Sequence, residues 1–199
     1  TLSISMHDEA GIENLGIPFC MTVEAEALGG EVEDGDEVTE PRIIHYPLKS
    51  VEEWRNLKGL NPYEDGRLPT ILACTSLLSQ GHPDIPVIGN LVGPVSLATS
   101  LIDATLLFKA LRREPKEVHG MLGFLADNSI RYGEALIKSG VDLIVISDPS
   151  ATGEILGPDA VVGVEVARHV GQVHRHVHQP LPAAVAGLEH GAHVGEHRM

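Results

Sequence analysis

Three apolar runs, separated by long helix-forming segments, constrain the fold of this chain most strongly. They lie at residues 18–23 (PFCMTV), 85–94 (IPVIGNLVGP) and 141–146 (VDLIVI). Consecutive strands joined by helical crossovers pair in parallel, and near-continuous apolar runs are typical of strands that helices cover. The pattern therefore predicts an α/β fold with a parallel sheet.

The segments between these runs carry helix signals. Ser50 with Glu53 three residues later is a capping-box pattern, Pro115 suits the first position of a helix, and Gly140 suits a helix end. The acidic segment EVEDGDEVTEP has the composition of a loop. The predicted helices span residues 50–58, 66–81, 96–114 and 116–138.

The ends of the apolar runs carry polar residues. Asp148 follows the third run, Asn90 lies in the second, and the segment 20–24 ends the first. An open doubly wound sheet and a (β/α)8 barrel both place their sites at the C-terminal ends of the strands. We therefore expect the functional groups of this chain to lie at that edge.

Charge and composition exclude some function classes. The net charge is −14 and no basic patch is present, which argues against nucleic-acid binding. No apolar run reaches the ~18 residues of a membrane span, so we expect no membrane partner. The two cysteines form neither a CxxC motif nor a disulfide framework, so we expect a cytoplasmic location.

Residues 160–199 differ in composition from the rest of the chain. Seven of the 11 histidines lie there, and the segment after residue 160 contains no Ile, Phe, Tyr, Trp, Ser, Thr, Asp, Asn, Lys or Cys. We interpret the segment as an atypical tail, either frameshifted or disordered. A metal site at His174, His176 and His178, which alternate as on one face of a strand, is the other interpretation.

Three stretches together resemble the uroporphyrinogen decarboxylase superfamily. They are NLGIPFCMTVEAEALGGEV, PVIGNLVGPVSLATSLI and SGVDLIVISDPSATGEILGP, and the likeness runs over about residues 5–159. The family fold is a (β/α)8 TIM barrel. The resemblance implies a partial barrel in which the three strands are the second, third and fourth of the family.

Within this superfamily the chain is similar to the cobamide-dependent methyltransferase branch. The decarboxylases carry an aspartate where this chain has Cys20 and a tyrosine where it has Ser100. The FCMTVEAEA and DPSATG segments instead resemble enzymes that move a methyl group from a methylated corrinoid protein to a small thiol such as coenzyme M.

The resemblance implies two cofactors, a zinc ion that activates the acceptor thiol and a corrinoid bound to the partner protein. The zinc ligands of the family, a His-x-Cys pair and a later Cys, belong to the C-terminal half of the barrel. We find no counterpart of them in this chain and assign no metal ligand. We therefore expect residues 1–199 alone to be an incomplete and inactive version of such an enzyme.

Asp148 is the candidate catalytic residue, since it follows a buried strand at the expected rim. The alternative is an Asx-turn before Pro149. For Cys20 the alternative to pocket lining is a small buried hydrophobe, and for Glu24 it is a solvated helical turn. The candidate substrate-binding residues are Cys20, Met21, Glu24, Asn90 and Ser150.

Two other functions compete with methyl transfer. A decarboxylase or other barrel lyase requires the carboxylate and tyrosine that positions 20 and 100 lack. A non-enzymatic histidine-rich metal-binding fragment depends on residues 174–178 and predicts metal binding by the isolated tail.

Overall fold

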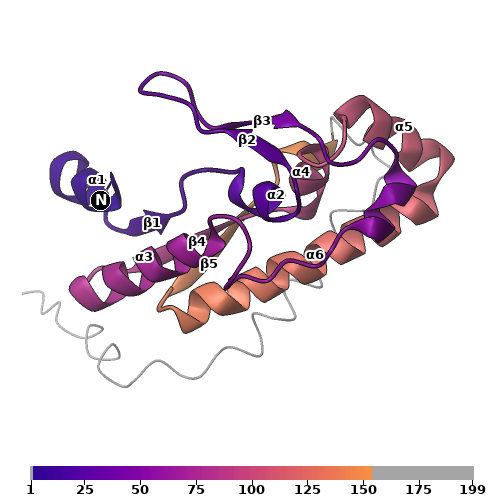
Figure 1. Ribbon diagram of the computed structural model, residues 1–199. Helices are drawn as coiled ribbons and strands as arrows, with labels where there is room; N and C mark the ends of the chain where they lie inside the picture. Colours follow the sequence, from indigo (N-terminus) through magenta and orange to yellow (C-terminus); the bar gives the residue numbers. More distant parts are fainter. Residues whose placement is uncertain (1, 154–199) are drawn as a thin grey trace, which may run out of the picture.

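The computed structural model describes residues 2–153, and a three-stranded parallel sheet organises them (Figure 1). The strands are β1 (Leu15–Ile17), β4 (Val87–Val92) and β5 (Leu143–Ser147), in the order β1-β4-β5. Gly16 lies opposite Ile88, and Asn90 lies opposite Val145. The predicted α/β class with a parallel sheet is confirmed, and the arrangement is part of a (β/α)8 barrel.

Helices and short 3-10 turns connect the strands. A small antiparallel hairpin of β2 and β3 projects from the body (Figure 1). The remaining elements are α1 (Leu2–Ala10), α2 (Val23–Ala27), β2 (Glu31–Glu33), β3 (Arg42–His45), η1 (Val51–Asn56), α3 (Leu68–Gly81), α4 (Pro94–Thr99), α5 (Ala104–Arg113), α6 (Pro115–Lys138) and η2 (Pro149–Ala151).

One face of the sheet is buried beneath α3 and α6. Leu15 and Leu91 point to this side, and α6 approaches so closely at Gly133 that an added Cβ would lie 3.3 Å from the Leu91 side chain. Burial of this apolar surface is the main stabilising contribution to the fold. The chief helical contributors to the core are Leu68, Leu72, Met121, Leu125, Tyr132 and Leu136.

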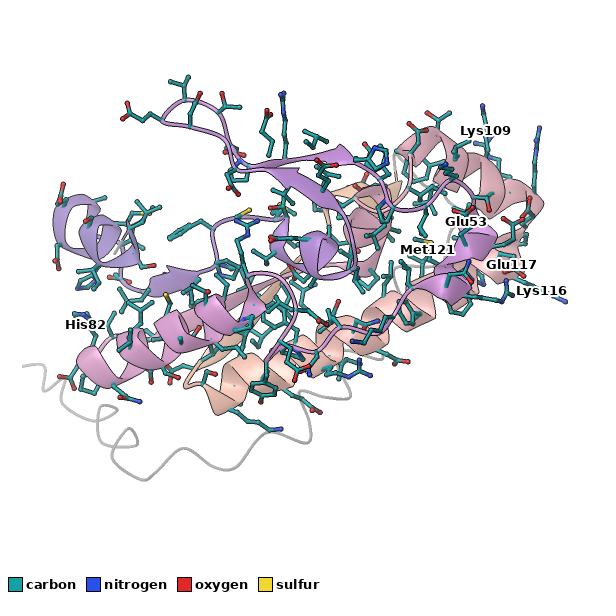
Figure 2. The ribbon with its side chains drawn as sticks, viewed as in Figure 1. Glu53, His82, Lys109, Lys116, Glu117 and Met121 are labelled. Atoms are coloured by element: carbon teal, nitrogen blue, oxygen red, sulfur yellow. The ribbon has the colours of Figure 1, made fainter. Side chains whose placement is uncertain are left out.

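The start of α6 is fixed against η1. Arg55 forms an ion pair with Glu117 and stacks over the Trp54 ring, with 5.2 Å between the guanidinium carbon and the ring centroid. Figure 2 shows Glu53 and Glu117 at this end of the molecule, and His82 at the far end of α3. The ion pair of Arg55 with Glu117 thus joins η1 to the first turns of α6 on the protein surface.

The first strand lies earlier than the apolar run 18–23 suggested. Strand β1 ends at Ile17, and Pro18 has no N–H with which to continue the ladder. The following residues form a loop, and the run ends in α2. The apolar character of this run therefore reflects a loop and the start of a helix, not a strand.

Two further sequence expectations need correction. The single helix expected over 96–114 is two helices, because Asp103 caps α5 by accepting hydrogen bonds from the N–H groups of Thr105 and Leu106. The acidic segment expected to be a loop contains β2, which pairs with β3. Cross-strand pairing overrides the weak strand propensity of Glu in these positions.

The boundaries of α6 follow the sequence closely, whereas the element expected at 50–58 differs in type. Pro115 is the first residue of α6, and Gly140 has φ of 105° just beyond the end of that helix, a conformation that favours glycine. At 50–58 the element is the 3-10 helix η1. Ser50 makes no side-chain cap there, and Glu53 instead accepts from the Lys49 N–H at 2.7 Å.

The tail 160–199, including the alternating histidines at 174–178, lies outside the described residues. Within residues 2–153, no helix combines the length and the apolar character needed to cross a membrane.

Candidate functional site

The carboxyl ends of the three strands meet at one edge of the sheet, because the strands are parallel. The Gly93 N–H donates to the Ser147 carbonyl at 2.8 Å, which joins the ends of β4 and β5. The loop 18–22 leaves β1 at the same edge. The Asn90 Nδ2 group donates to the Pro18 carbonyl at 3.0 Å and so ties this loop to β4.

Asp148 is held in place by the first turn of α4. Its carboxylate accepts hydrogen bonds from the N–H groups of Val95 and Ser96, at 3.1 and 2.8 Å, and from the Ser96 hydroxyl at 2.7 Å. The Ser150 N–H donates to the same hydroxyl at 3.0 Å. Asp148 therefore caps a helix that precedes it by more than 50 residues, and it forms no side-chain turn before Pro149.

Gly93 makes this capping geometry possible. A Cβ atom at position 93 would clash with the side chain of Asp148, so the carboxylate can reach α4 only across a glycine. The Gly-Pro sequence at 93–94 thus serves two purposes. It opens α4 with Pro94, and it leaves room for a carboxylate from the neighbouring strand.

Glu24 is a buried carboxyl group between α2 and the end of β4. Its side chain is 1% exposed, and Oε1 accepts from the Val92 N–H at 2.8 Å. Burial raises the pKa of Glu24 to about 7, although the hydrogen bond from Val92 partly lowers it. Among the described residues, Oε2 has no hydrogen-bond partner.

Tyr132 of α6 carries a second buried polar atom near this group. The residue is fully buried, and its hydroxyl has no hydrogen-bond partner among the described residues. Burial raises the pKa of Tyr132, and the negative charge of Glu24 raises it further. An acid and a phenol thus share an apolar interior behind the strand ends.

Cys20 belongs to a polar cluster on the loop after β1. Its Sγ lies 2.7 Å from the Thr22 hydroxyl, which also accepts from Arg67 Nη2 at 2.9 Å. Arg67 forms an ion pair with Glu26, and its Nη2 lies 4.0 Å from the Cys20 sulfur. Cys20 is therefore a half-buried thiol beside a guanidinium group, not an inert core residue.

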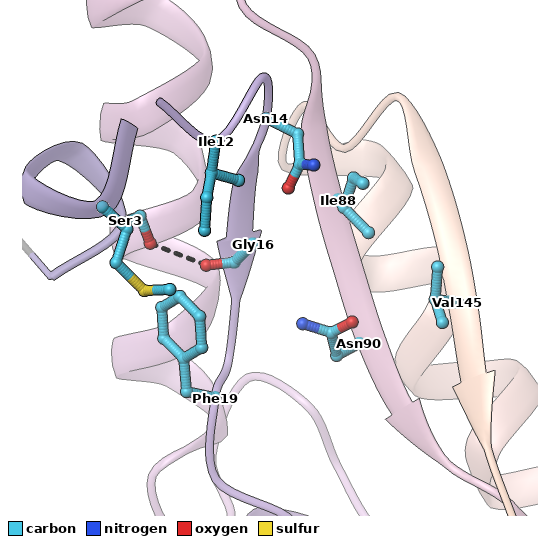
Figure 3. Close-up of a pocket in the computed structure, with 9 residues that line it drawn as sticks. Ser3, Ile12, Asn14, Gly16, Phe19, Ile88, Asn90 and Val145 are labelled. Atoms are coloured by element: carbon cyan, nitrogen blue, oxygen red, sulfur yellow. Dashed lines mark hydrogen bonds between the residues drawn. The ribbon is translucent and has the colours of Figure 1, made fainter. Parts of the chain in front are cut away.

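A pocket of about 220 Å³ lies on the sheet face opposite α3 and α6 (Figure 3). Asn90 and Phe19 face this space from different sides, with Gly16 and Val145 in its wall. Ser3 of α1 closes one side, and its hydroxyl donates to the Gly16 carbonyl at 2.6 Å. The pocket is mostly apolar, and Asn90 supplies an amide that can orient a ligand.

The structure divides the predicted site residues into two groups. Cys20, Glu24, Asp148 and Ser150 lie around the carboxyl ends of the strands, whereas Asn90 lines the pocket. The Met21 side chain is 43% exposed and is absent from the pocket wall.

Sequence reasoning overlooked the partners of these residues. Ser96 holds Asp148, and Arg67 and Thr22 hold Cys20. Ser96 follows a Gly-Pro helix start, which is a usable signal for a residue in the first turn. Arg67 lies 47 positions from Cys20 and carries no local signal.

A metal centre does not form from the described part of the chain. Among residues 2–153, no three His, Cys, Asp or Glu side chains gather closely enough to hold a metal ion together. The residues present therefore do not fit the zinc that the resemblance implies.

Comparison with known proteins decides the family. The sequence profile described as uroporphyrinogen decarboxylase (URO-D) matches residues 1–184. The chain belongs to this family. The match covers the Cys20 cluster, the buried Glu24, Asp148 with its helix α4, and the pocket, so these features are parts of a URO-D family fold.

Within the family, several of the similar curated proteins are methyltransferases. The chain is 34% identical over 158 residues to the methylcobamide:CoM methyltransferase MtbA of Methanosarcina acetivorans, covering 79% of this chain and 46% of that protein. For MtbA of Methanosarcina mazei the identity is 35% over 152 residues, with 76% and 44% covered. The chain thus spans about half the length of these relatives.

A solved structure supports the same conclusion about the fold. A methyltransferase from Methanosarcina mazei superimposes with a TM-score of 0.78 at 25% identity, over 86% of this chain and 52% of that protein. A uroporphyrinogen decarboxylase of Staphylococcus aureus is 26% identical over 112 residues, covering 53% of this chain and 32% of that protein. The likeness to the MtbA proteins is higher in identity and longer.

Proposed function

We propose that this chain forms part of an enzyme that transfers a methyl group from a methylated corrinoid protein to a small thiol such as coenzyme M. The observation that carries the proposal is the 34–35% identity to two methylcobamide:CoM methyltransferases over more than 150 residues. The URO-D family match, over residues 1–184, includes the strand-end rim, which consists of the ends of β4 and β5 and the loop 18–22. The corrinoid stays with the donor protein, which is the implied partner.

The rim has features that suit a small polar acceptor. Arg67 presents a guanidinium group beside Cys20 and Thr22, and the pocket offers the Asn90 amide in an apolar wall. In the proposed function, these groups bind and orient the acceptor, and Asp148 keeps α4 and the loop after β5 in position. Zinc would activate the thiol when bound, but the described residues supply no ligand set for it, and we assign no step to it.

The lyase alternative lacks its chemical groups. Cys20 replaces the expected carboxylate, and its sulfur is hydrogen-bonded with the Thr22 hydroxyl. Ser100 replaces the expected tyrosine, and its hydroxyl donates to the Ser96 carbonyl at 3.1 Å at the end of α4. Neither residue can serve as the stable anion that a tetrapyrrole decarboxylase places against the pyrrole nitrogens.

A chimera tests the proposal, because the chain spans about half of its relatives. Residues 1–153 replace the matching half of MtbA from Methanosarcina acetivorans, and methyl transfer from methylcobalamin to coenzyme M is measured beside the parent enzyme. We expect transfer to the thiol and no decarboxylation of uroporphyrinogen. A folded chimera without methyl transfer would contradict the proposal.

Variants of the chimera then test the rim. Asp148→Ala is expected to lower turnover, and Arg67→Ala is expected to raise the KM for the thiol. Lys109→Ala, at an exposed position of α5 (Figure 2), is the matched control and should leave both parameters unchanged. Unchanged kinetics in Asp148→Ala would assign this residue to the fold alone.

A further inference from the structure

Glu24 and Tyr132 are buried polar residues that the proposed function does not use. Glu24 is 1% exposed and Tyr132 is fully buried, and each keeps one oxygen, Oε2 and Oη, without a hydrogen-bond partner among the described residues. Buried polar atoms without partners are rare in native proteins because each loses its hydrogen bonds to water without replacement. The negative charge of Glu24 raises the pKa of the Tyr132 hydroxyl, so the two residues interact electrostatically.

Glu24 lies where α2 meets the end of β4. Glu24 belongs to the first turn of α2, Tyr132 belongs to α6, and Glu24 Oε1 accepts the N–H of Val92, the last residue of β4. Val92 is followed directly by Gly93, whose N–H bonds the end of β5. A change at Glu24 therefore reaches the rim of the sheet through a single backbone hydrogen bond.

Among the described residues, no full charge compensates Glu24 in this interior. Strand β4 and helix α4 carry no titratable side chain, and Glu26 of α2 is already paired with Arg67. On α6, Arg131 and Glu134 flank Tyr132 on the exposed side of the helix. Two further groups lie on neighbouring segments, the thiols of Cys20, before α2, and Cys74, in α3. The Asp148 carboxylate, which bonds the first turn of α4, is the charged group beside Gly93.

We propose that Glu24 is a proton-dependent switch for the strand-end rim: its neutral carboxyl holds α2 against Val92 at the end of β4, and its ionisation loosens this junction. In the neutral state one oxygen accepts the Val92 N–H and the other carries the proton. In the ionised state an uncompensated charge is buried in an apolar interior, which is costly. Opening toward water relieves that cost.

Burial places the ionisation of Glu24 near neutral pH. It raises the pKa of Glu24 to about 7, so the carboxyl changes its charge around neutral pH. The proposal does not depend on methyl transfer, and it holds for the chain as it stands.

Two measurements on the 199-residue chain test the switch. Infrared difference spectra between the parent chain and Glu24→Gln, recorded at about pH 6 and about pH 8.5, should show a protonated carboxylic acid band that is present only at the lower pH. Amide hydrogen exchange, corrected for the intrinsic pH dependence, should show the protection of Val92 falling at least about tenfold over the same range, which corresponds to about 1.4 kcal/mol.

The controls separate local from global effects. The amide of Leu107 in α5, which bonds the Asp103 carbonyl at 3.0 Å, should keep its protection, as should Val92 in Glu24→Gln. Glu26→Gln, on the same helix but already ion-paired in the parent, should retain the pH dependence of Val92. Absence of the acid band at the lower pH, or equal loss of protection at Leu107 and Val92, would overturn the proposal. If a variant fails to fold, the amide exchange of Val92 and Leu107 in the parent chain still distinguishes a local from a global loss of protection.

Discussion

The carboxylate of Asp148 accepts hydrogen bonds from both the backbone N–H and the hydroxyl of Ser96, at 2.8 and 2.7 Å. The first N–H groups of a helix have no partner within the helix, and α4 satisfies two of them with a side chain from the next strand. The polar residue after β5 is therefore fixed by a helix that follows β4. This contact couples the ends of two neighbouring strands.

Asp148→Ala is expected to lower the free energy of unfolding by about 1–2 kcal/mol, the usual effect of losing a helix cap. The loss has two sources, because two N–H groups of α4 and the Ser96 hydroxyl lose their acceptor. Urea denaturation measures the change. Ser147→Ala, one residue earlier and exposed, is the control and should stay within about 0.5 kcal/mol of the parent. Equal stability of Asp148→Ala and the parent would contradict the capping role.

Gly93→Ala is expected to destabilise the chain by about 1–3 kcal/mol, because the added methyl group clashes with the Asp148 side chain. Gly123→Ala is the matched control. Position 123 lies in α6 with nothing near an added Cβ, so alanine should be neutral or stabilising there. Thermal unfolding compares the two variants, and similar behaviour of both would show that Asp148 can move aside without cost.

The sequence predicts the parallel sheet and the boundaries of α3 and α6 because these depend on local signals. Apolar runs mark β4 and β5, and Pro115 and Gly140 mark the ends of α6. The sequence misplaces β1, since an apolar run does not distinguish a three-residue strand from the loop after it. The break between α4 and α5 is equally local, at Asp103, but continuous helix propensity on both sides conceals it.

The candidate site is harder to predict because its partners are distant in sequence. Asp148 and Glu24 are identified by position, but their bonds to Ser96 and Val92 cross 52 and 68 residues. The burial of Glu24 could not be predicted either, because the sequence around it resembles that of a solvent-exposed first helical turn. Such contacts follow from packing, which a single sequence does not specify.

Asn128→Ala is expected to cost about 2 kcal/mol, although this residue lies outside the candidate site. The Asn128 Oδ1 atom accepts the Leu60 N–H at 2.9 Å in a buried position, and removing the amide leaves that donor unpaired. Asp127→Ala, its exposed neighbour on α6, is the control and should change little. Urea denaturation of both variants checks the prediction, and equal midpoints would show that water replaces the amide.

The stability of the chain is expected to fall as the pH rises from about 4.5 to about 7, in the part of the profile that Glu24 contributes. Burial raises the pKa of this carboxyl from 4.5 to about 7 in the folded chain. The folded state therefore binds more protons than the unfolded state between these values, and the free energy of unfolding decreases with increasing pH.

The contribution is fully present below pH 4.5 and is lost above about pH 7, with a total on the order of 3 kcal/mol. Glu24→Gln keeps the size of the side chain and cannot ionise, so its stability should not show this decline. Urea midpoints of the parent and the variant, measured at intervals from about pH 5 to about pH 8.5, give the difference directly. The two curves should diverge as the pH rises, with the variant the more stable at the upper end. Parallel curves would mean that Glu24 ionises without cost and that its burial is relieved in solution.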